Sequence, residues 1–218
     1  RSGDAHTETD QFKFYDSSAY FDGNGDYLTA ASALIPTTGD FTLELWVRLN
    51  ALTTTQCLAS QKHDISNNDG RVRFYVEATT GKVILFVGGT GGFTLTSTHG
   101  IAATTWTHVA VTRSSNVFRL FINGAVEATS GTQTITLENV ATRIGLYVAA
   151  TADYLAGYVQ DLRITSLARY TEAFTPPGKL IGAISGTVYD ANGDPAARKI
   201  VAWPRAIHPP TTSVIYST

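Results

Sequence analysis

Short runs of alternating apolar and polar residues recur along the chain, with turn-forming residues between them. Such alternation is typical of β-strands that bury one face, because successive side chains of a strand point to opposite sides. No stretch keeps a helical period for three turns, and the only single helical turn that the pattern suggests is at 166–170. The pattern predicts many short strands, the clearest at 18–21, 27–30, 41–49, 56–61, 72–78, 82–88, 107–113, 117–123 and 158–165. Many short strands with regular turns indicate a sandwich or a barrel.

The clearest hairpin begins at Trp106, where two predicted strands are followed by Asn123-Gly124. Alternation places Trp106 and His108 on one face of the first strand, opposite to a face that carries valines. Asn-Gly supplies the two positive-φ residues of a type I′ turn, so a further strand should begin at Ala125. This segment is sheet architecture and carries no catalytic motif.

Turn residues and composition also divide the chain. Pro176-Pro177-Gly178 marks the best candidate boundary, because proline cannot continue a β-ladder. Residues 184–203 read as a strand, a turn and a return strand, too short to bury a core alone. We therefore predict a polar lead-in at 1–12, a sandwich at 13–177, and a linker with a partial second β-domain at 178–218. Methionine is absent, even at position 1, which suggests a piece of a longer protein.

The composition limits the classes of partner that the protein is expected to bind. Hydrophobic residues make up 43% of the chain and charged residues only 16%, with a net charge of −2. Scattered basic residues argue against nucleic acid, and no apolar run is long enough to predict a membrane span. The single cysteine, Cys57, excludes an intrachain disulfide and is expected to be a buried apolar residue.

Several segments, in order, carry a family resemblance: 17–28 (SSAYFDGNGDYL), 39–48 (GDFTLELWVR), the Trp106 hairpin and 157–164 (GYVQDLRI). They resemble the concanavalin A-like, laminin-G-type domain. The resemblance implies an all-β jelly-roll sandwich of two antiparallel sheets that is non-catalytic and used for adhesion or glycan binding. Relatives usually carry a further strand upstream of residue 13, so one sheet edge is expected to lack its partner or to take one from another chain.

Two other segments resemble more particular proteins. Residues 167–177 (LARYTEAFTPP) are similar to the version of the domain found in bacteriophage tail and virion proteins. The segment from Ile184 is similar to a carboxypeptidase-regulatory-like (prealbumin-like) β-domain. The resemblance implies a place in a virion, with other virion proteins and host-surface glycans as partners, and a homo-oligomer in which repetition raises avidity.

Three acidic residues are candidates for a calcium site. Asp22 and Asp26 flank a glycine-rich turn, and the strand that carries Asp161 is expected beside it. Calcium takes six to eight hard oxygen ligands, which carboxylates and turn carbonyls supply. Gln160 stands where the family often has an aspartate, which removes one ligand. The alternative is that Asp22 and Asp26 cap the turn through hydrogen bonds to the backbone.

Aromatic residues in or near loops are candidates for sugar binding, because a ring face stacks on the apolar face of a pyranose. Trp46 and Trp106 are assigned to the core, and His108 to a structural role. The expected binding rim comprises loops at about 63–70, 88–100 and 147–156. The candidate ligand contacts are Phe93, Tyr147, Tyr154 and Tyr158.

No catalytic signature is present, so we predict that the domain is not an enzyme. Glycosidases need two converging carboxylates, and Glu44 has no acidic residue at the alternate positions of its strand. The leading hypothesis is a phage virion module that binds glycans. Its rivals are a ligand-free capsid decoration or spacer, a carbohydrate-binding module of a secreted bacterial enzyme, and a cryptic glycoside hydrolase.

Overall fold

The computed structural model describes residues 1–62, 70–147, 153–178, 188–189 and 195–196. These residues contain no helix, and therefore none of the length and apolarity that a membrane-spanning helix needs. The chain divides into two compact units, Arg1–Pro176 and Pro177–Thr218. In the second unit the described strands are β16 (Val188–Tyr189) and β17 (Pro195–Ala196), which pair antiparallel. The remainder of the predicted C-terminal hairpin lies outside the described residues.

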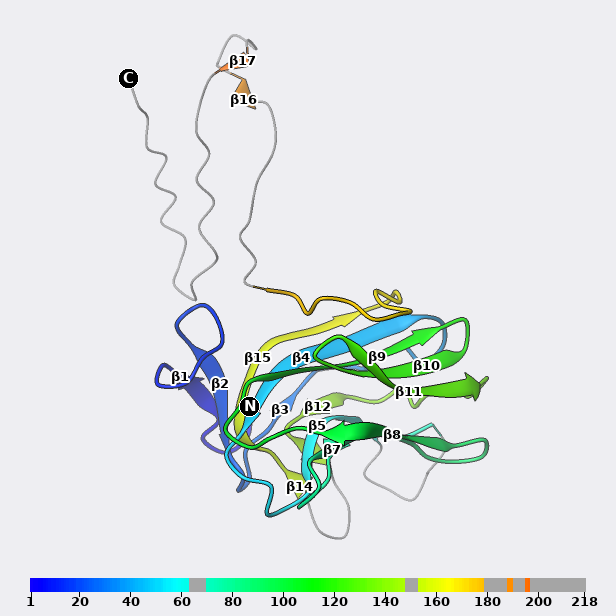
Figure 1. Ribbon diagram of the computed structural model, residues 1–218, viewed down its shortest axis with the longest axis horizontal. Helices are drawn as coiled ribbons and strands as arrows, with labels where there is room; N and C mark the ends of the chain where they lie inside the picture. The colour runs from blue at the N-terminus through cyan, green and yellow to red at the C-terminus, as the bar shows by residue number, and fades with distance from the viewer. Residues whose placement is uncertain (63–69, 148–152, 179–187, 190–194, 197–218) are drawn as a thin grey trace. The chain divides into compact units, whose positions relative to one another are not determined.

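The first unit is built from two large antiparallel sheets that lie in two layers (Figure 1). The seven-stranded sheet has the order β1 (His6–Glu8), β2 (Ser18–Asp22), β15 (Ala156–Thr165), β4 (Phe41–Leu49), β9 (Thr107–Ser114), β10 (Val117–Ile122), β11 (Ala125–Thr132). The six-stranded sheet has the order β3 (Leu28–Thr29), β12 (Thr142–Ile144), β5 (Gln56–Gln61), β6 (Val72–Val76), β7 (Lys82–Val87), β8 (Phe93–Gly100). A small hairpin joins β13 (Leu146–Tyr147) to β14 (Asp153–Tyr154).

The core lies between the two sheets, where central strands such as β4 and β9 contribute every second side chain. Its largest fully buried side chains include Phe21, Phe41, Phe74 and Phe118. Burying apolar surface at about 25 cal/mol per Å² is the main stabilising contribution to such a sandwich. The all-β sandwich of two antiparallel sheets that the sequence predicts is confirmed, and Cys57 is fully buried as expected.

The Asn123–Gly124 turn has the predicted geometry. Both residues have positive φ, 48° and 79°, and β11 begins directly afterwards at Ala125. Gly124 has a second reason to be glycine, because a Cβ there would collide with the carbonyl oxygen of Phe174. Phe174 also donates its backbone N–H to Gly124 O at 3.0 Å. The turn thus holds the segment 166–176, which we call the strap.

The structure corrects three expectations about local structure. The first twelve residues contain β1, which pairs with β2, so the sheet edge expected to lack its upstream strand is paired within the chain. The segment 88–100, expected to be a rim loop, contains the edge strand β8. The strap forms no helical turn at 166–170. β1 and β8 contain few apolar residues, so neither has the apolar run that predicts a strand.

Candidate functional site

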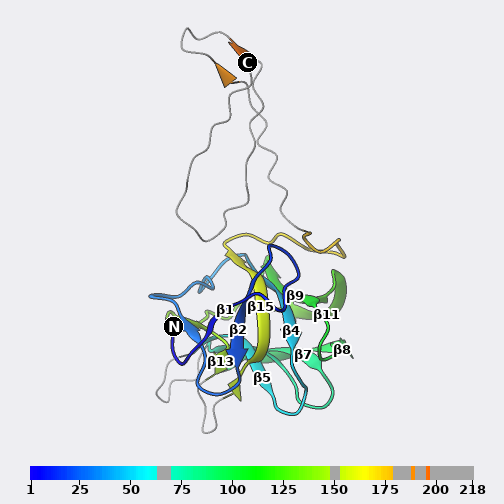
Figure 2. The ribbon, with the colours of Figure 1, turned by 90° about the vertical axis from the view of Figure 1, so that its left-hand side faces the viewer.

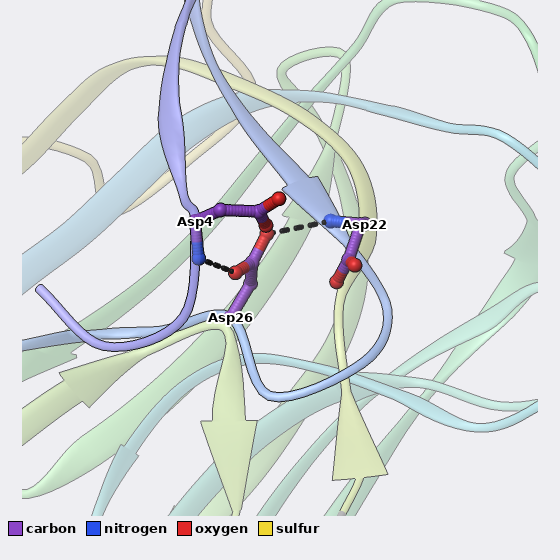
Figure 3. A group of neighbouring side chains, drawn as sticks. All are labelled: Asp4, Asp22 and Asp26. Atoms are coloured by element: carbon purple, nitrogen blue, oxygen red, sulfur yellow. Dashed lines mark hydrogen bonds between the residues drawn. The ribbon is translucent and has the colours of Figure 1, made fainter.

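Three aspartates from the N-terminal part of the chain converge at one end of β1 and β2. One carboxylate oxygen each from Asp4, Asp22 and Asp26 lies within 4.8 Å of the others. Figure 3 shows the three side chains gathered at the turn that follows β2. Asp26 is fully buried, whereas Asp4 and Asp22 are exposed.

Hydrogen bonds to the backbone organise this acidic group. Asp26 accepts the N–H of Asp4 at 2.8 Å and that of Asp22 at 2.9 Å. Burial opposes the ionisation of Asp26, but these bonds outweigh it and lower the pKa of the carboxyl. Asp22 in turn accepts the N–H of Asn24 at 2.6 Å. A Cβ on Gly3, whose φ is +67°, would collide with the Asp26 carboxylate. These contacts are the turn-capping role that the sequence offered as its alternative.

The same oxygens have the chemistry that a hard cation takes. Converging carboxylates are ligands for calcium, and the exposed side chains of Asp4 and Asp22 would each contribute a carboxylate oxygen. Asp161, the third predicted ligand, is not in this group, and Asp4 stands there instead. Asp161 lies at a bulge of β15 with φ 50°, where burial raises the pKa of its carboxyl. Calcium binding stays a prediction.

A row of side chains crosses the outer face of the seven-stranded sheet, away from the core. The strand register pairs His6 with Tyr20, and Tyr20 with Tyr158. Tyr158 pairs with Arg48 on β4, and the β4–β9 register places Trp106 opposite Arg48. Figure 2 shows β1, β2, β15 and β4 following one another in this order. We call these five residues, His6, Tyr20, Tyr158, Arg48 and Trp106, the aromatic row.

The rings of the aromatic row contact one another. Their centroids are 5.3 Å apart for His6–Tyr20, 4.9 Å for Tyr20–Tyr158 and 6.5 Å for Tyr158–Trp106. The guanidinium of Arg48 lies 5.6 Å from the centroid of the Tyr158 ring. The His6 side chain is 44% exposed and the other four residues are half-buried. The expectation that Trp106 belongs to the core is therefore wrong, because alternation points its side chain outwards.

Farther along the same strands, the outer face is covered. Glu44 of β4 has only 2% of its side chain exposed. Its Oε2 accepts a hydrogen bond from the Tyr170 hydroxyl at 2.9 Å and lies 3.3 Å from Nε2 of His108. Its Oε1 lies 3.2 Å from Nε of Arg169 and 3.5 Å from a guanidinium nitrogen of Arg163. Burial opposes its ionisation, but His108, Tyr170 and Arg163 outweigh burial and lower the pKa of Glu44.

We call these residues, Glu44, His108, Tyr170, Arg163 and Arg169, the Glu44 cluster. The strap covers it: the rings of Tyr170 and Phe174 stack with centroids 3.5 Å apart, and Phe174 contacts His108 edge-on at 5.7 Å. Figure 1 shows the strap, in gold, on the side of the seven-stranded sheet that faces away from the six-stranded sheet. Glu44 therefore anchors the strap, because two strap residues, Arg169 and Tyr170, contact its carboxylate.

A second cover lies between the Glu44 cluster and the aromatic row. The side-chain oxygen of Gln160 accepts the backbone N–H groups of Lys13 and Phe14, and its amide nitrogen donates to the carbonyls of Phe14 and Ser17. The loop held in this way packs Phe14 edge-on against Trp46, with centroids 5.7 Å apart. Trp46 is therefore buried, as predicted, but on the outer face of the sheet.

The outer face of the six-stranded sheet carries a more tightly packed aromatic group. The guanidinium of Arg73 lies 3.9 Å from the centroid of the Tyr75 ring and 4.8 Å from that of Tyr147, and it forms an ion pair with Asp153. Tyr147 is 7% exposed, and burial raises the pKa of its hydroxyl. These contacts hold the β13–β14 hairpin against β6. Tyr154, on that hairpin, is half-buried.

The four predicted ligand contacts are thus separated in the structure. Tyr158 lies in the aromatic row, Tyr147 and Tyr154 lie on the β13–β14 hairpin, and Phe93 packs on the core residue Phe118 with ring centroids 4.8 Å apart. Their role in ligand binding stays a prediction. Much of the loop segments 63–70 and 147–156 lies outside the described residues.

Sequence reasoning missed four residues of these surfaces: Asp4, His6, Tyr20 and Arg48. Tyr20 and Arg48 occupy outward positions of strands that the pattern did predict, so alternation could have identified them. Asp4 and His6 belong to the polar N-terminal segment, in which no pattern indicated a strand. Their proximity to β2 follows only from the pairing of His6 with Tyr20.

The two antiparallel sheets form a two-layer β-sandwich. The family model described as the Concanavalin A-like lectin/glucanases superfamily (Laminin_G_3) matches residues 22–173. The chain therefore belongs to this superfamily. No curated protein matches the sequence.

Solved structures of the same fold are distant in sequence. Domain 4 of AbnA, an extracellular arabinanase from Geobacillus stearothermophilus in complex with arabinotriose, is 18% identical with a TM-score of 0.62, covering 76% of this chain and 77% of its own. The CBM40 of Ruminococcus gnavus IT-sialidase bound to α2,3-sialyllactose is 14% identical with a TM-score of 0.55, covering 66% and 94%. The mouse laminin α1 chain domains LG4-5 are 20% identical with a TM-score of 0.54, covering 80% and 47%. These similarities establish the fold.

Proposed function

We propose that this domain is a non-catalytic glycan-binding module and that the aromatic row is its binding surface. The observation that carries the proposal is the row itself, which presents neighbouring half-exposed rings on a rigid sheet. Pyranose rings stack on such surfaces through their C–H faces. Two proteins of similar fold, a CBM40 and an arabinanase domain, are described as bound to sugars, which supports the ligand class.

The polar groups beside the rings suit hydroxyl recognition. Arg48 lies over Tyr158, and His6 is 3.6 Å from Glu8. A hydrogen bond to the carbonyl of Asp4, at 2.8 Å, raises the pKa of His6, to which Glu8 also contributes. Hydrogen-bond donors (Arg48 and His6) and an acceptor (Glu8) therefore border the rings. Glu44, the carboxylate under the strap, is buried and held by the Tyr170 hydroxyl and by neighbouring cations, which favours binding without catalysis.

The test is binding of the full chain to a glycan array and to purified bacterial surface polysaccharides, followed by tryptophan fluorescence. Trp106→Ala and Tyr158→Ala should each weaken binding about threefold to tenfold, the effect of one lost stacking contact. Tyr154→Ala, on the separate β13–β14 hairpin, is the matched control and should leave binding unchanged. A loss with Tyr154→Ala alone would move the site to the β13–β14 hairpin.

The same experiment separates the other hypotheses. New reducing ends would indicate a glycoside hydrolase, and no retention on any glycan would leave a spacer or capsid decoration. The setting in a bacteriophage virion rests on the sequence resemblance, and retention on bacterial surface polysaccharide would support it. Retention only on cell-wall or storage polysaccharides would favour the carbohydrate-binding module of a secreted enzyme.

A further inference from the structure

We infer that the aromatic row binds an extended stretch of a neutral, linear glycan that lies across the strands, instead of a single terminal sugar. This inference rests on the proposed function and specifies its ligand. The inference rests on five outward side chains that lie opposite one another on neighbouring strands and so form one line across the sheet.

The length of the row is limited by its ring contacts. The centroid distances between successive rings, 5.3, 4.9 and 6.5 Å, allow at most about 17 Å from the His6 ring to the Trp106 ring. The widest spacing between successive rings is the 6.5 Å between the centroids of Tyr158 and Trp106, and Arg48 lies over the Tyr158 ring there. A surface of this length exceeds what one sugar ring covers. It therefore offers several stacking positions to consecutive sugar units.

The borders of the row favour a chain that lies along it. On one side the loop 13–17 covers Trp46, two residues from Arg48 on β4. On the other side Asp22 follows Tyr20 by two residues on β2, close to Asp4. The row ends at β1, an edge of the sheet, so a glycan can continue beyond His6. A linear ligand fits between these borders without bending.

The charges around the row favour a neutral glycan. The β1 end carries the acidic residues Asp4, Glu8 and Asp22. The cations lie nearer to β4: Arg48 over Tyr158, and Lys13, whose ammonium is 4.6 Å from the centroid of the Trp46 ring. A polyanion needs a concentrated positive surface, and the acidic end would repel it. Hydroxyl groups, in contrast, can donate to the carboxylates and accept from the guanidinium.

The test uses the full chain with β-1,4-linked gluco-, manno- and xylo-oligosaccharides of two to six units, with sialyllactose and polygalacturonate as comparisons. For at least one neutral series, affinity should rise about tenfold or more from the disaccharide to the hexasaccharide, because more rings are covered. Tyr20→Ala and Trp106→Ala, on either side of Tyr158 in the row, should each weaken binding of the hexasaccharide about threefold to tenfold and binding of the disaccharide less. Tyr20→Phe and Trp106→Phe keep the ring and should retain most of the affinity.

The outcomes separate this inference from the proposed function. Binding of sialyllactose or polygalacturonate alone, still weakened by Trp106→Ala, would overturn the inference and keep the aromatic row as a glycan site. Affinity that does not depend on chain length would do the same. Binding of none of these carbohydrates would overturn the inference, and the glycan array then decides the proposed function. Thermal unfolding of each variant confirms that it is folded.

Discussion

The outer face of the seven-stranded sheet has two halves that use the same strands for opposite purposes. On β4, Glu44 is buried beneath the strap, whereas Arg48, two outward positions later, is half-buried in the aromatic row. On β9, His108 is buried and Trp106, just before the strand, is half-exposed. Alternation is the same in both halves, but only one half has a cover.

The contrast between the two halves shows that the covering segments decide which outward-facing side chains are buried and stabilise the fold. Under the strap, charged groups are paired and aromatic rings stack. The hydroxyl of Thr42 also holds the strap, because it accepts the N–H of Arg169 and donates to the carbonyl of Leu167. In the aromatic row the side chains contact one another with their faces left half-open. Stability should therefore depend on the covered half and binding on the open half.

The largest expected effect is the loss of Glu44. Glu44→Ala leaves His108, Arg163 and Arg169 without their shared carboxylate, and removing one partner of a buried pair costs about 3 to 5 kcal/mol. Denaturant unfolding should show this loss. Trp106→Ala, in the open half, should cost about 1 kcal/mol or less. Equal costs for the two variants would break the distinction between the halves.

A smaller loss is expected when the strap is displaced at the turn. In Gly124→Ala the new Cβ collides with the Phe174 carbonyl, and a non-glycine residue must hold a φ of +79°. Strain of this kind costs about 1 to 3 kcal/mol. Gly25→Ala is the control, because that glycine has φ +85° but no heavy atom within 4 Å of its added Cβ. If the two variants unfold alike, the strap contributes nothing beyond the turn.

The pH dependence of stability should also distinguish the halves. The pKa of Glu44 is lowered from 4.5 in the folded chain, so its contribution is present above that value and is lost as pH falls through the folded pKa. The stability difference between the wild type and Glu44→Gln should therefore shrink as pH falls below 4.5. A constant difference across the acid range would contradict the ionised role of Glu44. Equilibrium unfolding at each pH measures it.

The smallest effect concerns the acidic group beside the open half. If calcium binds there, its addition should raise the unfolding midpoint relative to EDTA, by an amount that grows with calcium concentration. Asp22→Asn, which removes one exposed carboxylate, should abolish that increase. Asp161→Asn, outside the group, should leave it intact. Calcium independence of the wild type would leave the turn-capping role of Asp26 as the full account.

The sandwich strands were predictable where a strand buries one apolar face. The predicted ranges 41–49 and 56–61 match β4 and β5. β4 alternates apolar and polar residues, and β5 is a short run of buried residues that follows turn-forming threonines. β1 was not predictable, since His6–Glu8 has no apolar residue and its pairing with β2 supplies its structure. β8 alternates Phe93, Leu95 and Ser97 towards the core, a pattern weakened by its threonines.

The candidate sites were predictable only in part. Tyr158 was selected for its place near a loop. It faces outward because it alternates along β15 with Val159, which faces the core. Asp22 and Asp26 were recognised from the glycine-rich turn, whereas Asp4 joined them through long-range pairing. Trp106 was assigned to the core because tryptophan is usually buried.

The sequence by itself determined the class of fold, the faces of its central strands and the geometry of the Asn123–Gly124 turn. These features depend on local alternation and on backbone preferences, which neighbouring residues contain. Only the tertiary structure decided which outward residues are covered. That decision depends on where the strap and the loop 13–17 are held, by Glu44 and Gln160 across long sequence separations. The aromatic row is exposed because neither segment covers it.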